Sequence, residues 1–174
     1  MGQGRGIRPG GPADADSLLA MLDEALAWLA DRGLGEQCRT GPPAARPALV
    51  RRVRAMAASG DLWIARLDGV VAGAVVLSGQ APAYVPAAAG PELFISLIVS
   101  ARRYAGRGVG TALLDFARFQ ADQRGVRLLR VDCWAGGEGA LPAYYMQAGF
   151  TLGASFTVDG WPGQVLEQRL PARP

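Results

Sequence analysis

The segment from Leu93 to Trp134 constrains the fold of this chain more than any other. It contains an apolar run, Leu93–Val99, a glycine-rich turn, an amphipathic stretch, Gly108–Arg124, and a second apolar run, Leu128–Trp134. Short apolar runs bounded by turn residues favour buried strands, whereas apolar residues at helical spacing favour a helix. A strand–helix–strand unit of this length usually makes a right-handed crossover between parallel strands. We therefore expect a sheet that contains a parallel pair.

Hairpins are expected on both sides of this crossover. Before it, β-like runs at Leu62–Leu67 and Val70–Leu77 meet at Asp68-Gly69, a dipeptide that suits a tight turn because both positions need positive φ. After it, strands are expected at Thr151–Val158 and Gln164–Leu170. Together with the helices, these strands predict a mixed α/β (α+β) fold, in which helices cover both faces of a mixed sheet.

Further helices are expected around the sheet. Leucines at helical spacing predict a helix over Ala15–Arg32, with Asp14 or Asp16 as its capping residue. The remaining segments are a short first strand, two more helices and a long loop, at Gly6–Pro9, Ala48–Ala58, Ala140–Ala148 and Gly79–Glu92.

The size and composition of the chain indicate one globular domain. Its 174 residues can bury a single core, and we expect one domain over 7–171 that follows a flexible tail at 1–6. Half of the residues are hydrophobic and no apolar run reaches the roughly 20 residues of a membrane span, so the sequence favours a soluble protein without membrane contact. The segment Met1–Gly11 lacks the apolar stretch of a signal peptide, which favours the cytoplasm.

The composition also excludes several kinds of site. The absence of histidine removes Ser-His-Asp triads and histidine metal sites, and the distant Cys38 and Cys133 suggest neither a disulfide nor a metal site. No bound metal is expected. The net charge of +3 is carried by arginine alone, and the cluster Arg51, Arg52 and Arg54 is either a nucleic-acid patch or a solvated helix face. The diffuse charge favours the second interpretation, without a nucleic-acid partner.

The turn before the helix is suited to bind an anion. Glycines recur at alternate positions, Gly106, Gly108 and Gly110, so the backbone can approach a ligand closely. The dipole of the following helix adds partial positive charge, which favours phosphate. Arg103 and Arg107 can add further positive charge. An ATP-binding loop of the Walker type would need a lysine, and a dinucleotide fingerprint would need a glycine where the chain has Thr111. The alternative is that the glycines only let the helix pack closely on the strand.

Two motifs resemble the GNAT superfamily of N-acyltransferases, and further residues, Trp28-Leu29, Asp132-Cys133-Trp134 and the pair Tyr144-Tyr145, look like one bacterial branch of it. The first is Leu97-Ile98-Val99 followed by Ala105-Gly106-Arg107-Gly108-Val109-Gly110-Thr111, although Ala105 stands where the family has Arg or Gln, and Arg103 fits that pattern two residues earlier. The second is Tyr145-x-x-x-Gly149-Phe150, about 35 residues further along. The resemblance implies a mostly antiparallel sheet with a V-shaped splay between two central parallel strands.

The resemblance also implies a site for acetyl-CoA (coenzyme A) as acyl donor. Its pantetheine arm would pair with backbone groups of Ile98, Val99 and Ser100, and its pyrophosphate would bind the turn, at Arg103, Gly106, Arg107, Gly108, Val109, Gly110 and Thr111. Tyr145 would be the acid that protonates the leaving thiolate. Glu92 would be the base, with Asp132 and Asp159 as alternatives.

The reaction that the resemblance implies is acetyl transfer to a primary amine by direct attack. The acceptor would be a small-molecule amine, a peptide or an amino-acid-like compound that contacts the loop Gly79–Glu92, the first two helices and the turn at Asp159–Trp161. A CoA-sensing module without catalysis and a transferase with a hydroxyl acceptor are the alternatives. Family members are often dimers, so a homodimer is the assembly to test.

Overall fold

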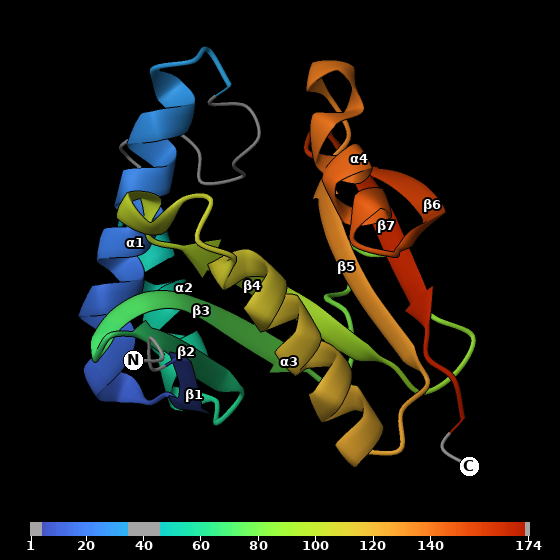
Figure 1. Ribbon diagram of the computed structural model, residues 1–174. Helices are drawn as coiled ribbons and strands as arrows, with labels where there is room; N and C mark the ends of the chain where they lie inside the picture. Colours follow the sequence, from blue (N-terminus) through green and yellow to red (C-terminus); the bar gives the residue numbers. More distant parts are fainter. Residues whose placement is uncertain (1–4, 35–45, 173–174) are drawn as a thin grey trace. The chain divides into compact units, whose positions relative to one another are not determined.

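The computed structural model describes residues 5–34 and 46–172. Its strands form a seven-stranded sheet in the order β1-β2-β3-β4-β5-β7-β6 (Figure 1). The strands are β1 (Arg5–Pro9), β2 (Leu62–Leu67), β3 (Val70–Ser78), β4 (Leu93–Ser100), β5 (Leu128–Trp134), β6 (Thr151–Val158) and β7 (Trp161–Arg169). The longer helices are α1 (Ala15–Ala30), α2 (Arg46–Ala58), α3 (Val109–Gln123) and α4 (Ala140–Gln147), joined by the short 3-10 helices η1 (Pro12–Asp14), η4 (Arg102–Tyr104) and η5 (Gly137–Gly139).

The strand pairing confirms the predicted fold class. The pairs β1–β2, β2–β3, β5–β7 and β6–β7 are antiparallel, while β4 and β5 are parallel, with Leu93–Ile95 opposite Leu129–Val131. The crossover through α3 therefore joins parallel strands, as the sequence predicts. The expected splay of β4 and β5 beyond this ladder stays a prediction.

The chain divides into two compact units. The first comprises the chain up to Val76 together with Leu97–Leu114, and the second comprises Leu77–Ser96 and the chain from Asp115 onward. The strands β3 and β4 and the helix α3 each run from one unit into the other. The predicted single domain over 7–171 stays a prediction.

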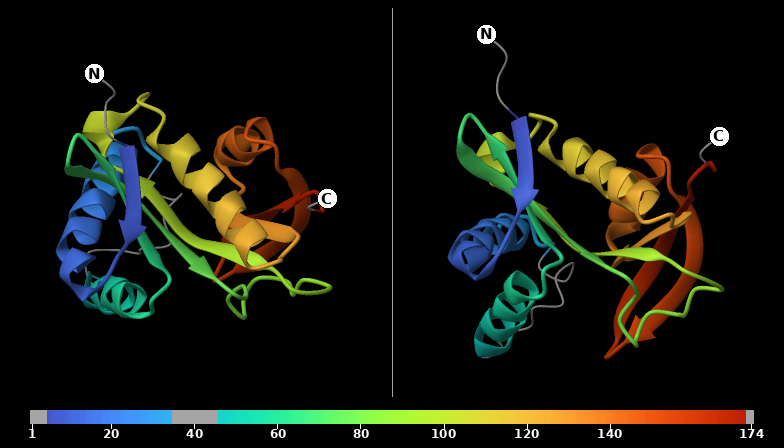
Figure 2. Two further views of the ribbon diagram at one scale, coloured as in Figure 1. Left: turned by 60° about the horizontal axis from the view of Figure 1, so that its bottom comes forward. Right: turned by 90° about the horizontal axis from the view of Figure 1, so that it is seen from below.

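In the first unit, helices cover both faces of the strands (Figure 2). On one face, Leu18 of α1 and Val53 of α2 are buried in one cluster with Leu62 and Ile64 of β2. On the other face, α3 approaches β3 at Gly73. A Cβ atom on Gly73 would lie 2.7 Å from Val109 Cγ1 and 3.0 Å from Leu113 Cδ1, so the missing side chain is what allows this close packing.

In the second unit, α4 packs against the strands β5, β6 and β7. Leu129 and Val131 of β5 and Leu166 of β7 are almost fully buried, and Phe150 follows α4 into this core. The guanidinium of Arg118 on α3 donates to the carbonyl oxygen of Ala148 and to Gln168 Oε1. The second half of α3 is thereby hydrogen-bonded to the end of α4 and to β7.

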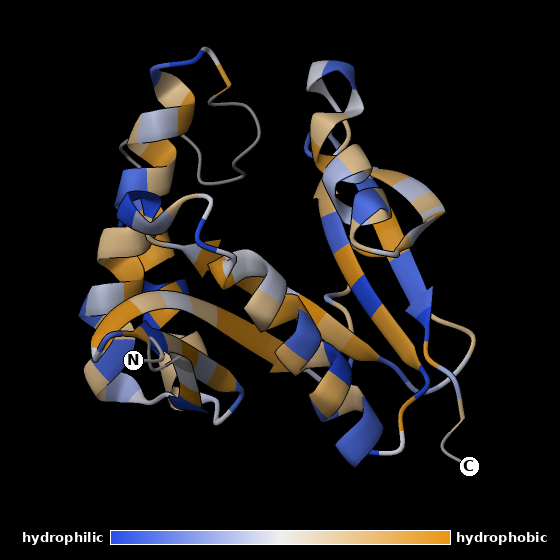
Figure 3. Cartoon of the chain, in the orientation of Figure 1, coloured by the Kyte–Doolittle hydropathy of each residue, from blue (hydrophilic) through white to orange (hydrophobic). Residues whose placement is uncertain are grey.

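Hydropathy along the chain agrees with this burial (Figure 3). The strand β3 is hydrophobic along most of its length, and six consecutive residues, Ala72–Leu77, are buried. On α2, Arg51, Arg52 and Arg54 are exposed while Val53 is 1% exposed, as expected of a solvated helix face. None of the described helices combines the length and the apolar character that crossing a membrane requires.

Several element boundaries differ from those predicted. The first strand begins at Arg5 rather than Gly6, and α2 begins at Arg46 rather than Ala48. The strand β7 begins at Trp161, three residues before the predicted start, because Asp159 and Gly160 both have positive φ and form a tight hairpin turn. Pro162, the second residue of the strand, lacks the N–H that most strand positions use.

Asp14 lies at the N-cap of α1, but it does not cap the helix through its side chain. Its carboxylate instead accepts two hydrogen bonds from Arg8, at 2.6 Å and 3.0 Å, and one from the Gly11 N–H at 3.0 Å. The predicted cap position is therefore right and the predicted capping bond is wrong. The side chain links β1 to α1 in its place.

Candidate active site

The glycine-rich turn has the local geometry of an anion cradle. Gly106 and Gly108 have φ values of +74° and +73°, a conformation that residues with a Cβ rarely adopt. Around them, the Ala105 N–H donates to Arg102 O and the Arg107 N–H to Tyr104 O, each at 3.0 Å. The two glycines thus provide the two positive φ values in the turn between η4 and α3.

The helix that follows presents its first N–H groups at this turn. The Ala112 N–H donates to Gly108 O at 3.0 Å as an early helical bond, so the N–H groups of Val109, Gly110 and Thr111 precede it. Such first-turn donors have no acceptor within their own helix, and the dipole of the 15-residue helix adds partial positive charge there. The turn can therefore accept a phosphate through backbone groups alone.

All ten residues predicted to bind the cofactor belong to the first unit. Val99 is buried next to the turn, since its carbonyl oxygen and the Val109 side chain both lie close to Gly73. Ile98 and Ser100 are half-buried at the end of β4. The structure thus brings the predicted pantetheine-binding strand and the predicted pyrophosphate-binding turn together.

Arg103 is held by protein groups. Its Nη2 donates to Val71 O at 3.1 Å, its Nη1 lies 3.7 Å from Glu24 Oε1, and its guanidinium stands 5.0 Å from the centre of the Tyr104 ring. A contact to phosphate would have to compete with these partners. Arg107 is exposed on the turn.

A cation–π contact that the sequence did not reveal joins the turn to α1. The guanidinium of Arg102 lies 3.9 Å from the centre of the Trp28 ring, and Arg32 lies 4.1 Å from the same ring. The Arg102 N–H also donates to Glu24 Oε2 at 3.3 Å. These residues are more than 70 positions apart in the chain, so only the folded structure reveals that α1 holds the turn in place.

Tyr145, the predicted acid, is buried in the second unit and is 6% exposed. The rings of Tyr144 and Phe150 meet it edge-on, with centroids 5.2 Å and 5.7 Å away. Burial raises the pKa of Tyr145 well above its ordinary value, and the negative charges of Cys133, Tyr144 and Asp132, where ionised, raise it further. The phenol therefore stays protonated and can act as a hydrogen-bond donor across the neutral range.

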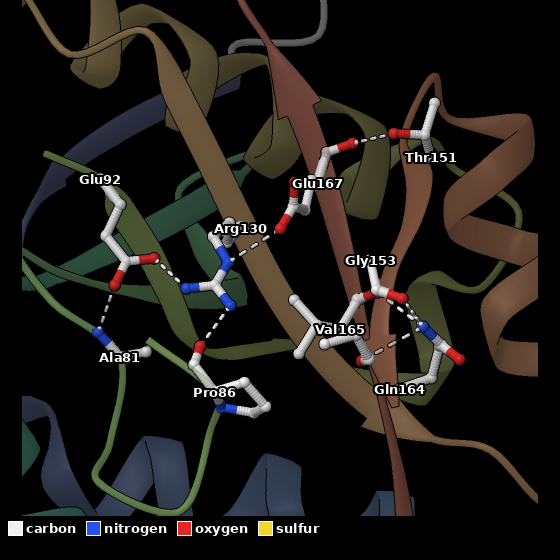
Figure 4. A network of polar contacts seen from close by, with 10 residues as sticks. Ala81, Pro86, Glu92, Arg130, Thr151, Gly153, Gln164, Val165 and Glu167 are labelled. Carbon is white, nitrogen blue, oxygen red and sulfur yellow. Dashed lines mark hydrogen bonds and ion pairs between the residues drawn. The ribbon is translucent and has the colours of Figure 1, made fainter. Parts of the chain in front are cut away.

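The predicted base, Glu92, is buried in the same unit within a polar network (Figure 4). Its Oε1 accepts a hydrogen bond from the Ala81 N–H at 2.9 Å, and its Oε2 accepts one from Arg130 Nη1 at 2.8 Å. Arg130 itself is 1% exposed and donates from Nη2 to Pro86 O at 2.6 Å. No feature of the local sequence signals this pair, because its partners are 38 residues apart.

The other polar candidates differ in their surroundings. Asp132 is half-buried on β5, whereas Asp159 is exposed in the hairpin turn between β6 and β7. Cys133 is a buried free thiol, and burial, with the nearby Asp132, raises its pKa to about 12. Cys38 lies outside the described residues. Within the described ranges, no group of three or more acidic or cysteine side chains is arranged to hold a metal ion.

The loop between β3 and β4 encloses an open hollow of about 570 Å³, lined by Gly79–Ala88 and Gly90–Glu92. Most of its lining residues are apolar, and the Tyr84 ring packs against Phe156 of β6 with centroids 5.9 Å apart. Phe156 in turn lies 6.2 Å from the Trp161 ring. The loop and the turn at Asp159–Trp161, both predicted to contact the acceptor, are thus connected through aromatic side chains within one unit.

Comparison with solved structures shows the same fold in known acetyltransferases. An acetyltransferase of the GNAT family from Listeria monocytogenes is 18% identical, with a TM-score of 0.72 over 98% of this chain and 99% of that chain. A putative acetyltransferase from Salmonella typhimurium, solved with its cofactor acetyl-CoA, is 16% identical, with a TM-score of 0.60 over 98% and 96%. An N-acetyltransferase from Thermoplasma acidophilum in complex with coenzyme A is 14% identical, with a TM-score of 0.65 over 96% and 99%.

The family itself follows from the sequence comparison. A search of curated proteins gave no match. The model of the family described as Acetyltransferase (GNAT) family, however, matches residues 22–150, which include the glycine-rich turn and the Tyr145 motif. Because this match spans well over half of the chain, the protein belongs to the Acetyltransferase (GNAT) family.

Proposed function

We propose that this protein transfers an acetyl group from acetyl-CoA to a primary amine. The observation that carries the proposal is the turn before α3, in which Gly106 and Gly108 both have positive φ. The chain belongs to a family of acetyltransferases, which agrees with this use of the turn. Two proteins of the same fold were solved with acetyl-CoA or coenzyme A. Their ligands support this donor over other nucleotides.

The donor would bind mainly through backbone groups. The pantetheine arm would pair with Ile98, Val99 and Ser100, as a strand pairs with a neighbour. The pyrophosphate would accept N–H bonds from the turn and the first residues of α3, over 106–111. Because Arg103 already contacts Val71 and Glu24, we assign it a supporting role in which its charge favours the phosphates without direct contact.

We assign Tyr145 as the donor to the leaving thiolate. The amine attacks the thioester carbonyl carbon, the new C–N bond forms as the C–S bond breaks, and the sulfur takes up negative charge. A phenol whose pKa is raised by burial is a weaker acid than a free one, but it reliably offers its O–H hydrogen. Its contribution is therefore greatest in the transition state, where that hydrogen bond strengthens.

Glu92 is the carboxylate that the sequence resemblance nominates, yet both of its oxygens already accept hydrogen bonds in a buried setting. Each oxygen keeps a second lone pair, but a proton taken from an ammonium would remove the negative charge that pairs with the buried Arg130. These contacts favour a role in holding the loop over a role in proton transfer.

The acceptor is proposed to be a small-molecule or amino-acid-like amine. The hollow of the loop Gly79–Glu92 is lined mainly by alanine, proline and glycine, which suits an apolar group beside the reacting amine. We further propose a cytoplasmic location and a homodimer. Sedimentation of the purified protein would check the second.

The test is a thiol-release assay with acetyl-CoA and a panel of amines that includes polyamines, amino acids, amino sugars and short peptides. Amine-dependent release of coenzyme A, with the acetylated amine found by mass spectrometry, is the expected result. Binding of acetyl-CoA without release would instead favour a CoA-sensing module. Release that depends on alcohols and not on amines would favour a hydroxyl acceptor.

A further inference from the structure

Among the residues that the structure describes, Arg130 is the largest fully buried side chain. A guanidinium removed from water costs several kcal/mol unless charges and hydrogen bonds compensate it. Arg130 lies on β5, a strand whose neighbouring residues Leu129 and Val131 are also buried, so both faces of the strand are covered here. Hydrophobic packing alone would be better served by an aliphatic residue at this position.

The guanidinium of Arg130 points its three nitrogens at three different partners (Figure 4). Nη1 donates to Glu92 Oε2 at 2.8 Å and Nη2 donates to Pro86 O at 2.6 Å, while Nε lies 3.5 Å from Glu167 Oε1. Two of these three partners belong to the loop between β3 and β4. The fork geometry of arginine is what allows one side chain to reach both.

Glu92 extends the same network to the beginning of the loop. Its second oxygen accepts the Ala81 N–H at 2.9 Å, so the carboxylate that ends the loop also closes it onto its first residues. Pro86, bonded to Arg130, lies midway between them. The middle and the end of a loop without regular secondary structure are thereby bonded to one buried side chain of β5, and the start of the loop is bonded to Glu92.

The fixed loop is the one that encloses the hollow of about 570 Å³. Apolar packing anchors its middle, because Val85 is buried with Phe94 and Val165, and Tyr84 packs against this cluster. Hydrogen bonds fix the two ends of the loop, because Glu92 accepts one from the Ala81 N–H and another from Arg130. The shape of the hollow therefore depends on an ion pair that the solvent does not reach.

We infer that Arg130 and Glu92 are positioning residues, which hold the loop Gly79–Glu92 in the shape that binds the acceptor. This inference rests on the proposed function for the identity of the acceptor, but not for the anchoring of the loop. Glu92 acts on the reaction through the loop, and the attacking nitrogen, which is positively charged once the C–N bond forms, releases its proton to water. Loss of Arg130 leaves the buried Glu92 carboxylate without its cationic partner, and loss of Glu92 leaves Arg130 with only the more distant carboxylate of Glu167, at 3.5 Å.

The test compares four proteins: wild type, Glu92→Gln, the double variant Glu92→Gln/Arg130→Met, and Arg66→Met as a matched arginine control. Arg66 is an exposed residue of β2 that donates to Gly69 O. The double variant removes both charges together, and the amide oxygen introduced by Glu92→Gln can still accept the Ala81 N–H, so this protein is expected to fold. Hydrogen exchange of peptides covering 80–91, acetyl-CoA affinity, and KM and kcat for the best amine of the panel are measured.

In the double variant, we expect hydrogen exchange across 80–91 to accelerate about tenfold or more. The KM for the amine should rise about tenfold, while kcat and the affinity for acetyl-CoA should stay within about twofold of the wild-type values. Glu92→Gln is expected to keep the shape of the pH–rate profile, and Arg66→Met to match wild type. Unchanged exchange in the double variant would overturn the anchoring. A fall in kcat of about a hundredfold in Glu92→Gln, at unchanged amine KM and loop exchange, would make Glu92 the base after all.

These outcomes are separable from failure of the proposed function. A wild-type chain that binds acetyl-CoA but acetylates no amine would overturn the acceptor part of the inference along with that function. Loop exchange in the variants would still decide whether Arg130 and Glu92 anchor the loop.

Discussion

Tyr145 lies edge-on between two aromatic rings, and its hydroxyl is the only part of it that chemistry could use. Replacing it with phenylalanine keeps this packing and removes the O–H. We expect Tyr145→Phe to lower kcat about 100-fold and to leave the affinity for acetyl-CoA unchanged, measured by steady-state kinetics and calorimetry. Tyr144→Phe is the matched control, because Tyr144 is 45% exposed, and it is expected to stay active. Full activity of Tyr145→Phe would exclude the assigned role.

The same residue carries a prediction about pH. A tyrosine acid is active while protonated, and the raised pKa of Tyr145 moves the loss of that proton above its ordinary value near 10. The plot of kcat against pH should therefore show no decline from this group up to about pH 10. An alkaline decline near pH 9 that disappears in Tyr145→Phe would contradict the burial of the hydroxyl during turnover.

Asp14 gives a residue-scale prediction about stability. Hydrogen bonds from Arg8 lower the pKa of its carboxyl in the folded state, with help from the Gly11 N–H. The resulting stabilisation is present above the unfolded pKa, close to 4, and is lost as the pH falls below it. Asp14→Asn should lower the free energy of unfolding at pH 7 by about 1 kcal/mol, and by less at pH 2.5, in denaturant titrations. Asp16→Asn, an exposed change in the same helix, should show neither effect.

At this scale the sequence predicted residue types better than contacts. Tyr145 and the glycines were identified because each belongs to a local motif. The pairing of Glu92 with Arg130 and the packing of Arg102 on Trp28 were not predicted, since each joins residues that are distant in the chain. The position of Glu92 in the sequence suggested a base, but it could not reveal that both carboxylate oxygens accept hydrogen bonds within the protein.

Among the elements, the turn between η4 and α3 can be tested against a second turn of matched geometry. Gly106 and Gly69 both have φ between +70° and +80°, and a Cβ at either would have no heavy atom within 4 Å. Alanine should therefore strain the backbone at both positions by about 1–2 kcal/mol. We expect only Gly106→Ala to weaken acetyl-CoA binding, about tenfold or more by calorimetry, because only that turn is assigned to the pyrophosphate.

If Gly106→Ala and Gly69→Ala lose the same amount of stability but only Gly106→Ala binds acetyl-CoA more weakly, the effect on binding is separate from the effect on folding. If Gly106→Ala and Gly69→Ala bound acetyl-CoA equally well, the glycines of the turn would serve only the packing of α3 on the sheet. That alternative was open from the sequence, and Gly73 now shows where close packing is needed. A Cβ at Gly106 would meet no heavy atom within 4 Å, so close packing does not account for that glycine.

Element types followed from periodicity, whereas their ends depended on tertiary context. The run at 62–77 was predicted as a hairpin because Asp68-Gly69 has one favoured conformation, and the structure has it. The early start of β7 was not predicted, and Pro162 at that start has no N–H of its own to donate. Its carbonyl oxygen accepts the Ala135 N–H at 2.9 Å, so the residue still takes part in hydrogen bonding without its own donor.

At the scale of the whole chain, the sequence predicted the parallel crossover but not the full strand order. The insertion of β7 between β5 and β6 depends on pairing Leu128–Trp134 with Gly163–Arg169, which no local pattern specifies. The family and its fold are accordingly well determined by two motifs. The acceptor is not, because the loop Gly79–Glu92 has no period and takes its shape from Arg130.

Cofactor choice is a property of the folded chain and can be tested without an acceptor. A ligand that binds only the native state stabilises it by about 2.7 kcal/mol at 100 times its Kd. For a chain of this length, we expect a rise in Tm of roughly 5–10 °C with acetyl-CoA. ATP and NAD should give no comparable shift, since the turn lacks the lysine of the first site type and the third glycine of the second. Thermal scans of wild type and Gly106→Ala, with each ligand at equal concentration, would show which ligand the turn binds. An equal rise in Tm with ATP or NAD would refute the assignment of the turn to coenzyme A.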